Sequence, residues 1–455
     1  MRPPNSNILA QSRAVPIGTL VRDSKNPRVH SSKQIKKIAL SIRKFGFLNP
    51  IILDENNTVL AGHGRLEAAL IEGLTHVPVV CFSHLTPVQK RAYLIADNKI
   101  AEEAGWNREL LAIELSELTD LLPVEGLDVS ITGFATPEVD LLLEDMASST
   151  LPEEKLPSLP QRPVTQEGDL WQLGKHRLLC ADSHKVASFH QLLEGELVDA
   201  VFCDPPYNVR VRSIGGRGRI QHQEFAFASG EMSSDQFRKF LTRTLGNGIR
   251  VSKPGAVHFV CMDWRHVDDL IAVGRKIFGA MLNLAVWNKS NAGQGSFYRS
   301  QHELIGIFRV GDESHKNNIE LGRFGRSRSN VWSYPGVNTF GRGRMEALAM
   351  HPTVKPTAMV ADALLDVTAR GDAVLDQFAG SGTIFLAAEK IGRIAYGMEI
   401  DPRYVDVAIR RWQGVTKLEA VLVGDGRTFE EIEEARSKVT VDPPSLSQDQ
   451  VNSHG

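Results

Sequence analysis

Apolar and polar residues alternate along the chain in two different ways. In the first region, Ile35, Ile38, Ala39 and Ile42 recur at helical spacing, which predicts a helix over Lys33–Phe45 capped by Ser32. Short apolar runs bounded by turn residues predict strands, and longer mixed runs predict helices. The expected strands are Pro50–Asp54, one starting at Val59, and Val77–Phe82, and the expected helices are Leu66–Gly73 and Pro87–Ala101.

Beyond residue 167 the pattern changes to apolar strands that alternate with helices. This alternation indicates an α/β fold with a parallel sheet. The expected strands are the hairpin Leu170–Ala181, Val198–Phe202, Gly255–Asp263, Leu282–Asn288, a turn and strand in Phe297–Phe308, Val374–Leu375, and Arg393–Ile400. The expected helices are Ala358–Ala369, Ile384–Ile391 and Arg403–Trp412, the last capped by Asp401.

Shifts in composition divide the chain into six segments. Residues 1–14 and 437–455 are polar tails that we expect to be disordered. Residues 15–105 form a compact domain, 106–146 a helical extension, and 167–430 a large domain. Residues 147–166 hold four prolines among polar residues, which predicts an extended linker.

Overall charge and cysteine content exclude several classes of protein. The 455 residues carry a formal net charge of −2, so any contact with nucleic acid must be local. The four cysteines lie far apart without a C-x-x-C pair, so we expect no metal site and a reducing compartment. No apolar run approaches about 18 residues. We therefore expect a cytoplasmic protein without a membrane contact.

The first chemical motif, Cys203–Asn208, follows the strand Val198–Phe202. Pro205 and Pro206 cannot continue a central strand, and the carboxyl edge of an open sheet is where ligands bind. Asp204 and the Pro205 carbonyl can accept from the two N–H groups of a planar amine, while Tyr207 stacks on its ring. An Asp-Pro turn after a core strand is the alternative.

The second motif, Val374–Thr383, is a strand that enters a glycine-rich turn before a helix. Glycines allow a ligand to approach the backbone, and the helix start offers free N–H groups. Glu399 ends the next strand, where an acid can accept from ribose hydroxyls. The dinucleotide-binding fingerprint fits imperfectly because a third glycine is missing.

Together these two motifs resemble the amino-group DNA methyltransferases of the circularly permuted β class, over about Glu167–Gln413. The resemblance implies a Rossmann-like methyltransferase sheet, S-adenosylmethionine as cofactor, and catalysis by Asp204, Pro205, Pro206 and Tyr207. The cofactor-binding residues that it implies are Asp182, Thr353, Lys355, Asp376, Phe378, Gly380, Ser381, Gly382, Thr383 and Glu399. For Asp182, capping of the following helix is an equal alternative. For Trp287-Asn288-Lys289 the resemblance implies a position that lines the base pocket, and a strand end with Trp287 packed in the core is an equal alternative.

Residues 15–105 resemble the ParB/sulfiredoxin-like amino-terminal domain, an α+β fold. The resemblance rests on Phe45-Gly46, Asn49–Ile51, Ala61–Arg65 and Val77–Val79. It implies a nucleotide or DNA phosphate at the Gly62–Arg65 loop, and Arg65 as a cap of nearby carbonyls is the alternative. That loop has no cysteine, which argues against sulfiredoxin activity. Within Trp106–Asp145 we identify no recognition helix.

Two arginine-rich stretches are the expected DNA contacts. The first abuts the catalytic motif and the second lies in residues 311–350, the predicted target-recognition region, where aromatic residues are interleaved. The residues are Arg210, Arg212, Arg217, Arg219, Arg323, Arg326 and Arg328. A protein partner for the second stretch is the alternative.

The expected function is a site-specific methyltransferase acting on adenine N6 in double-stranded DNA, in a bacterial or phage-encoded protein associated with the nucleoid. Adenine is favoured over cytosine N4 because Asp204, rather than Ser, precedes the prolines. Cytosine-N4 methylation is the near alternative, and a ParB-like DNA-binding or regulatory protein with an inactive methyltransferase body is the other. The recognition sequence, a homodimer and a partner nuclease of a restriction-modification pair stay open.

Overall fold

The computed structural model describes residues 12–23, 26–147, 156–209, 230–290, 292, 297–322, 326–335 and 354–439. The chain divides into two compact units, Met1–Leu143 and Glu144–Gly455. Each is described by itself. None of the helices in the described part of the chain combines the length and the apolarity that a membrane crossing needs.

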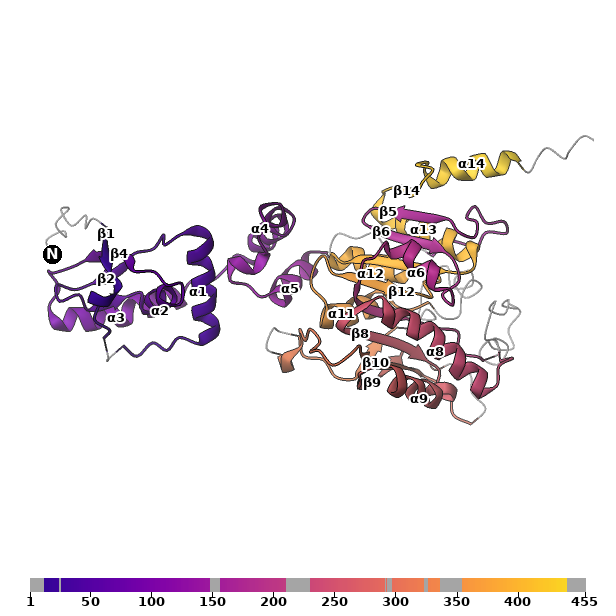
Figure 1. Ribbon diagram of the computed structural model, residues 1–455, viewed down its shortest axis with the longest axis horizontal. Helices are drawn as coiled ribbons and strands as arrows, with labels where there is room; N and C mark the ends of the chain where they lie inside the picture. The colour runs from indigo at the N-terminus through magenta and orange to yellow at the C-terminus, as the bar shows by residue number, and fades with distance from the viewer. Residues whose placement is uncertain are drawn as a thin grey trace, which may run out of the picture. The chain divides into compact units, whose positions relative to one another are not determined.

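The first unit is built on a small mixed sheet (Figure 1). Its strands lie in the order β1 (Arg13–Pro16), β4 (His76–Cys81), β2 (Ile51–Leu53) and β3 (Val59–Ala61). Helices α1 (Ser32–Phe45) and α2 (His63–Ile71) pack on each other, and α3 (Pro87–Glu102) contacts β3. The cap of α1 is Ser31, whose hydroxyl accepts from the Gln34 N–H, so the prediction of Ser32 was wrong by one residue.

The rest of the first unit is helical, as the sequence predicts. It contains α4 (Arg108–Leu121), two short 3-10 turns (Leu122–Glu125 and Val129–Thr132) and α5 (Thr136–Ala147). A separate small core holds these elements together through Ala112, Leu115, Val129, Val139 and Leu143.

The second unit is organised by a sheet that has ten strands among the described residues. Their order is β11 (Val331–Tyr334), β9 (Ala280–Lys289), β10 (His302–Arg309), β8 (Ser252–Met262), β7 (Val198–Cys203), β12 (Ala373–Asp376), β13 (Ile394–Glu399), β6 (His176–Cys180), β5 (Leu170–Leu173) and β14 (Ala420–Leu422). The central strands β8, β7, β12, β13 and β6 are all parallel. β10, β9, β5 and β14 continue the sheet by antiparallel pairing.

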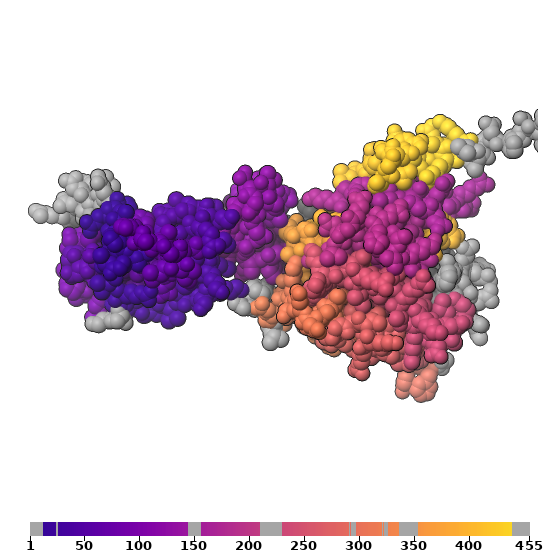
Figure 2. Space-filling model, viewed as in Figure 1, coloured from indigo at the N-terminus to yellow at the C-terminus, as the bar shows by residue number. Residues whose placement is uncertain are grey.

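Helices pack around this sheet in connected groups. α11 (Thr357–Val367) contacts α12 (Thr383–Ile391), which contacts α13 (Pro402–Thr416), and α8 (Ser234–Arg250) packs on α9 (Val267–Ile277). α6 (Val186–Leu193) lies against β6 and β13. Short 3-10 turns occur at Trp264–His266 and Glu320–Gly322. In Figure 2 the yellow surface of α14 (Phe429–Val439) borders the magenta surface of the β5–β6 hairpin, to which the Arg436–Asp169 ion pair ties it.

The predicted α/β class, with a methyltransferase-like sheet after a small α+β domain, is confirmed. Asp401 caps α13 by accepting from the Arg403 N–H, as expected. Both predicted tails were too long, because β1 begins at Arg13 and α14 continues to Val439. Helix α8 was missed, although Ser233 and Gln236 form a capping box at its start.

Candidate active site

Four acidic residues stand in a row where four neighbouring parallel strands end. Asp182 follows β6, Glu399 ends β13, Asp376 ends β12 and Asp204 follows β7. Strand pairing fixes this order, since Cys180 lies opposite Glu399, Asp376 opposite Gly397, and Leu375 opposite Val201. Three strand spacings cover about 14 Å, the scale of one extended nucleoside-sized ligand. The fold therefore brings the catalytic motif and the glycine-rich motif to adjacent positions.

The glycine-rich turn is shaped by packing as well as by backbone freedom. Gly382 has φ +78°, and a Cβ built on it would lie 2.6 Å from the Cβ of Ala408 in α13. The Gly380 N–H donates to Glu399 Oε2 at 2.9 Å. This bond joins the turn after β12 to the end of β13. Gly382 precedes α12 without a side-chain cap, so the helix start keeps backbone N–H groups for a ligand.

A buried arginine that sequence reasoning missed holds this turn in place. One terminal nitrogen of Arg411 donates to the Ser381 carbonyl at 2.9 Å, to the Ser381 hydroxyl at 3.0 Å and to the Thr383 hydroxyl at 3.1 Å. Both hydroxyls, predicted to contact the cofactor, therefore also anchor the turn to α13. No local signal in the sequence identifies Arg411, because its partners lie about 30 residues away along the chain.

Asp182 stabilises a turn and does not cap α6. Its Oδ1 accepts from the His184 N–H at 2.9 Å, whereas the residue at the cap position of α6 is Lys185. The capping alternative is therefore wrong. The role of Asp182 in cofactor binding stays a prediction.

Asp204 lies in a connected polar network with Tyr207 and Lys355. The Tyr207 hydroxyl donates to Asp204 Oδ1 and lies 3.1 Å from Glu303 Oε2. The Lys355 ammonium contacts Asp204 Oδ2 and lies 3.1 Å from the Tyr207 hydroxyl. Cofactor binding by Lys355 stays a prediction, and in this structure its ammonium already pairs with protein carboxylates. Its second such partner is Glu303, at 3.0 Å.

Glu303 and Lys289 complete this network. The sequence placed Lys289 in the segment that could line the base pocket and indicated no role for Glu303. Glu303 is buried near the start of β10 and binds Lys289 at the end of β9. Trp287 is also buried, and its indole N–H donates to the Tyr334 carbonyl at 3.0 Å. The ammonium of Lys289 lies 4.6 Å from the centre of the Trp287 ring. Trp287 thus packs in the core directly beside the network.

Burial shifts the pKa values of the acids along this edge. It raises the pKa of Asp376 to about 8 and that of Glu399 to about 7, although backbone N–H groups oppose both shifts. Burial also raises the pKa of Asp204, which Lys355 opposes and Glu303 reinforces. For Glu303, burial is outweighed by Lys355 and Lys289, which lower the pKa to about 2. Burial therefore disfavours the charged forms of Asp376 and Glu399, and a cationic ligand beside them would favour their ionisation.

Asn208 connects the two ends of the arginine-rich stretch after the catalytic motif. Its side-chain oxygen accepts from the N–H groups of Gly230 and Met232, and its amide donates to the Met232 carbonyl at 2.8 Å. Its φ of +54° lies in the left-handed region that asparagine tolerates. These bonds hold Asn208, Gly230 and Met232 together beside the candidate site.

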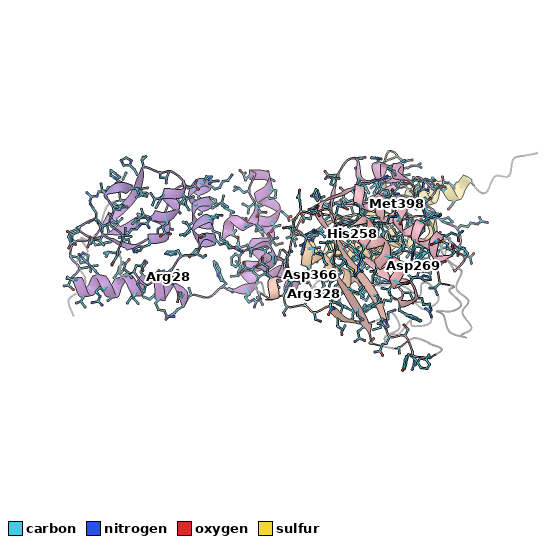
Figure 3. All side chains as sticks on the ribbon, turned by 60° about the horizontal axis from the view of Figure 1, so that its bottom comes forward. Arg28, His258, Asp269, Arg328, Asp366 and Met398 are labelled. Atoms are coloured by element: carbon cyan, nitrogen blue, oxygen red, sulfur yellow. The ribbon has the colours of Figure 1, made fainter. Side chains whose placement is uncertain are left out.

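Two of the predicted DNA contacts face the protein interior. Arg326 pairs with Asp362 and Asp366 of α11 at 3.1 and 3.2 Å, and Arg328 reaches the same two carboxylates at 3.0 and 3.1 Å. Figure 3 labels Arg328 and Asp366 side by side. The side chains are only 8% and 14% exposed, which favours a structural role within the protein, and their contact with DNA stays a prediction. Arginine content alone did not reveal their partners.

Other predicted site residues lie outside the described residues. These are Arg210, Arg212, Arg217, Arg219, Arg323 and Thr353, together with all of residues 336–350 in the predicted target-recognition region. Their roles stay predictions.

The Gly62–Arg65 loop of the first unit has the geometry of the capping alternative. Arg65 donates to the Pro50 carbonyl at 3.3 Å, and its guanidinium lies over Gly62, which has φ +99°. Burial lowers the pKa of Arg65. A phosphate at this loop stays a prediction.

Comparisons with known proteins agree with this geometry. Residues 198–410 match the DNA methylase family N6_N4_Mtase, which spans the catalytic and glycine-rich motifs. The methylase part of the chain belongs to the N6/N4 DNA methylase family. Residues 4–98 match the ParB N-terminal domain, as the sequence predicts. Residues 109–167 match a ParB-methyltransferase HTH domain, which corrects our finding of no recognition helix there.

Relatives of both parts are known. The type II methyltransferase M.HpaI of Haemophilus parainfluenzae is 23% identical over 249 residues, 52% of this chain and 73% of the relative. The ParB-like nuclease domain-containing protein YnaK of Escherichia coli is 40% identical over 76 residues, 17% of this chain and 87% of YnaK. The crystal structure of the M1.HpyAVI–SAM complex matches with 18% identity and a TM-score of 0.37, over 51% of this chain and 98% of that one.

The cofactor of the methylase domain is S-adenosylmethionine. The residues present fit it, because the glycine turn leaves N–H groups at the start of α12 and a cationic ligand would favour the ionisation of Asp376 and Glu399. The roles of Gly380, Gly382 and Glu399 in binding it stay predictions.

Proposed function

We propose that the chain methylates adenine N6 at specific sites in double-stranded DNA. The observation that carries this proposal is the adjacency of Asp204-Pro205 to the glycine turn, which the parallel pairing of β7 with β12 imposes. A methyl donor and an exocyclic amine held at these two places would lie within reach of each other. The amino-methyltransferase family of the domain supports the same chemistry.

In the proposed mechanism the protein orients and activates the amine. Asp204 and the Pro205 carbonyl each accept one amine N–H, so the nitrogen lone pair is drawn out of conjugation with the ring. Tyr207 packs against the base, and extracting that base from a duplex costs a few kcal/mol. When bound, S-adenosylmethionine would supply a methyl group that is already activated, and the methylated nitrogen would lose its surplus proton after the transfer. The protein therefore contributes orientation and electrostatics and needs no covalent nucleophile.

Adenine is preferred over cytosine because Asp204, rather than Ser, precedes the prolines. Cytosine N4 is the second candidate, since it is also an exocyclic amine and the family includes both activities. An inactive methylase body that serves a DNA-binding or regulatory ParB-like chain is the third.

The decisive experiment is transfer of tritiated methyl groups from labelled S-adenosylmethionine to unmethylated DNA, followed by nucleoside analysis. We expect N6-methyladenine, and we expect Asp204→Ala to lower kcat by at least about 100-fold because the amine loses its acceptor. The Asp204→Ala chain should keep its affinity for S-adenosylmethionine, which shows that it is folded.

Three outcomes would contradict the proposal. N4-methylcytosine as the product would favour the second candidate, and DNA binding without transfer would favour the third. Unchanged transfer by Asp204→Ala would remove the catalytic assignment.

A further inference from the structure

Four charged side chains from four separate elements alternate in sign beside the catalytic motif. Lys289 ends β9, Glu303 lies in β10, Lys355 precedes α11 and Asp204 follows β7. Successive members are ion-paired, Lys289 to Glu303, Glu303 to Lys355 and Lys355 to Asp204. We refer to these four residues as the charge row.

The interior members of the charge row are almost completely removed from water. The side chain of Lys355 is 5% exposed and that of Glu303 is 9% exposed. Burying an ammonium costs several kcal/mol unless carboxylates surround it. The Lys355 ammonium is stabilised because it lies between the carboxylates of Asp204 and Glu303. The Glu303 carboxylate is stabilised in turn because it lies between the ammonium groups of Lys289 and Lys355.

Lys355 also contacts both halves of the candidate site. Its side chain touches Asp204, and its backbone carbonyl lies 3.4 Å from the hydroxyl of Thr383, the first residue of α12. The position of Lys355 is thus tied to the glycine turn at one end and to the amine acceptor at the other.

We propose that Lys355 is a positioning residue for methyl transfer, which keeps Asp204 ionised and fixes the direction of its oxygens, and that Glu303 and Lys289 hold Lys355 in place. The proposal rests on the proposed function, because it assigns Asp204 as the acceptor for the target amine. A protonated Asp204 would lose one acceptor oxygen, so the state of this carboxyl decides whether the amine is activated.

The charged and titratable groups that face Asp204 act in opposite directions. Lys355 stabilises its anion, whereas Glu303 and Asp376 destabilise it. The groups packed around it from β7, β8, β10, β12 and the segment before α11 are Tyr207, Cys261, Glu303, Asp376 and Lys355. Removing Lys355 and removing Glu303 should therefore move the titration of Asp204 in opposite directions.

The structure provides a matched control. Lys316 also bridges two carboxylates, Asp199 near the start of β7 and Asp372 just before β12. These positions are at the opposite ends of the same two strands from Asp204 and Asp376. Lys316→Met removes an ammonium that also bridges two carboxylates, although it is 48% exposed against 5% for Lys355, without touching the candidate site.

The test is the pH dependence of kcat/KM for the full-length chain with duplex DNA and S-adenosylmethionine. We expect Lys355→Met to move the acid limb of the kcat/KM profile to higher pH by at least about one pH unit. We expect the same variant to lower kcat at pH 7 by about 100-fold. We expect Glu303→Gln to move the acid limb downward, because a negative neighbour is lost. Lys316→Met should leave the limb unchanged, and affinity for S-adenosylmethionine should change by less than about threefold throughout.

Two further measurements keep the proposal testable if a variant is unstable or the chain is inactive. The double variant Lys355→Met/Glu303→Gln removes one charge of each sign. Asp204 should still titrate at a higher pH in this variant than in the wild type. A ¹³C carboxyl titration, with Asp204 assigned by its loss in Asp204→Asn, reports the same shift without turnover.

An acid limb that stays fixed in Lys355→Met, or a loss of cofactor affinity in place of the limb shift, would overturn the positioning role. Absence of methyl transfer by the wild type would overturn the proposed function alone, since the carboxyl titration would still decide between the two roles of Lys355.

Discussion

At Asp376, burial of a charged carboxylate lowers the stability of the folded chain. Burial raises its pKa to about 8, against about 3.9 in an unfolded chain. Because the folded state holds this proton more tightly, stability is lost as pH rises from about 4 to about 8. A carboxyl kept at such a place indicates a use for its charge, since a neutral side chain would fit the fold better.

We therefore expect Asp376→Asn to stabilise the chain. An asparagine can still accept from the Phe378 N–H, which donates to Asp376 Oδ1 at 2.9 Å, and it carries no charge. The unfolding temperature should rise by at least about 2 °C at pH 8.5 and by less at pH 5, as measured by calorimetry at both pH values. The affinity for S-adenosylmethionine should fall in the same variant. Equal effects at the two pH values would show that the charge of Asp376 is not the cause.

At the scale of elements, the glycine turn between β12 and α12 depends on close packing against α13. Gly382→Ala would place a methyl group 2.6 Å from the Cβ of Ala408 in a left-handed backbone conformation. We expect a loss of about 1–3 kcal/mol of stability and at least about tenfold weaker binding of S-adenosylmethionine, measured by denaturant titration and calorimetry.

Gly371→Ala is the control for backbone strain alone. Gly371 has φ +79°, but a Cβ there would meet no atom within 4 Å, and it lies before β12, at the end away from the candidate site. We expect this variant to lose stability and to bind S-adenosylmethionine normally. Equal loss of binding in both variants would mean that general destabilisation, and not the shape of the turn, is responsible.

What the sequence predicted at this scale depended on how local each feature is. Asp204–Tyr207 and Gly380–Thr383 are continuous motifs at strand ends, so both were recognisable. The contact of Tyr207 with Glu303 joins residues 96 apart and exists only because β10 inserts antiparallel between β8 and β9. A linear pattern carries no information on that strand order, and for the same reason the partners of Arg326 and Arg411 were not foreseen.

Across the whole molecule, charged residues are distributed unevenly along the chain. The formal net charge of −2 conceals this uneven distribution. Residues 108–147, which run from the start of α4 to the end of α5, contain a single Lys or Arg, Arg108. The acidic residues there are Glu109, Glu114, Glu117, Asp120, Glu125, Asp128, Glu138, Asp140, Glu144 and Asp145. DNA affinity arises mainly from phosphate neutralisation by basic side chains.

We therefore predict that this segment, although matched to an HTH domain, does not lie against the DNA backbone. Glu114, Glu117 and Asp120 are exposed on α4, so the triple variant Glu114→Gln/Glu117→Gln/Asp120→Asn tests the point directly. If the helix lay close to phosphates, removal of three negative charges would tighten DNA binding strongly at low salt, where repulsion is least screened. We expect the Kd for duplex DNA, measured by fluorescence anisotropy from 50 to 200 mM salt, to change by less than about twofold. A tenfold tighter complex at 50 mM salt that converges with the wild type at 200 mM would place α4 at the DNA and refute the prediction.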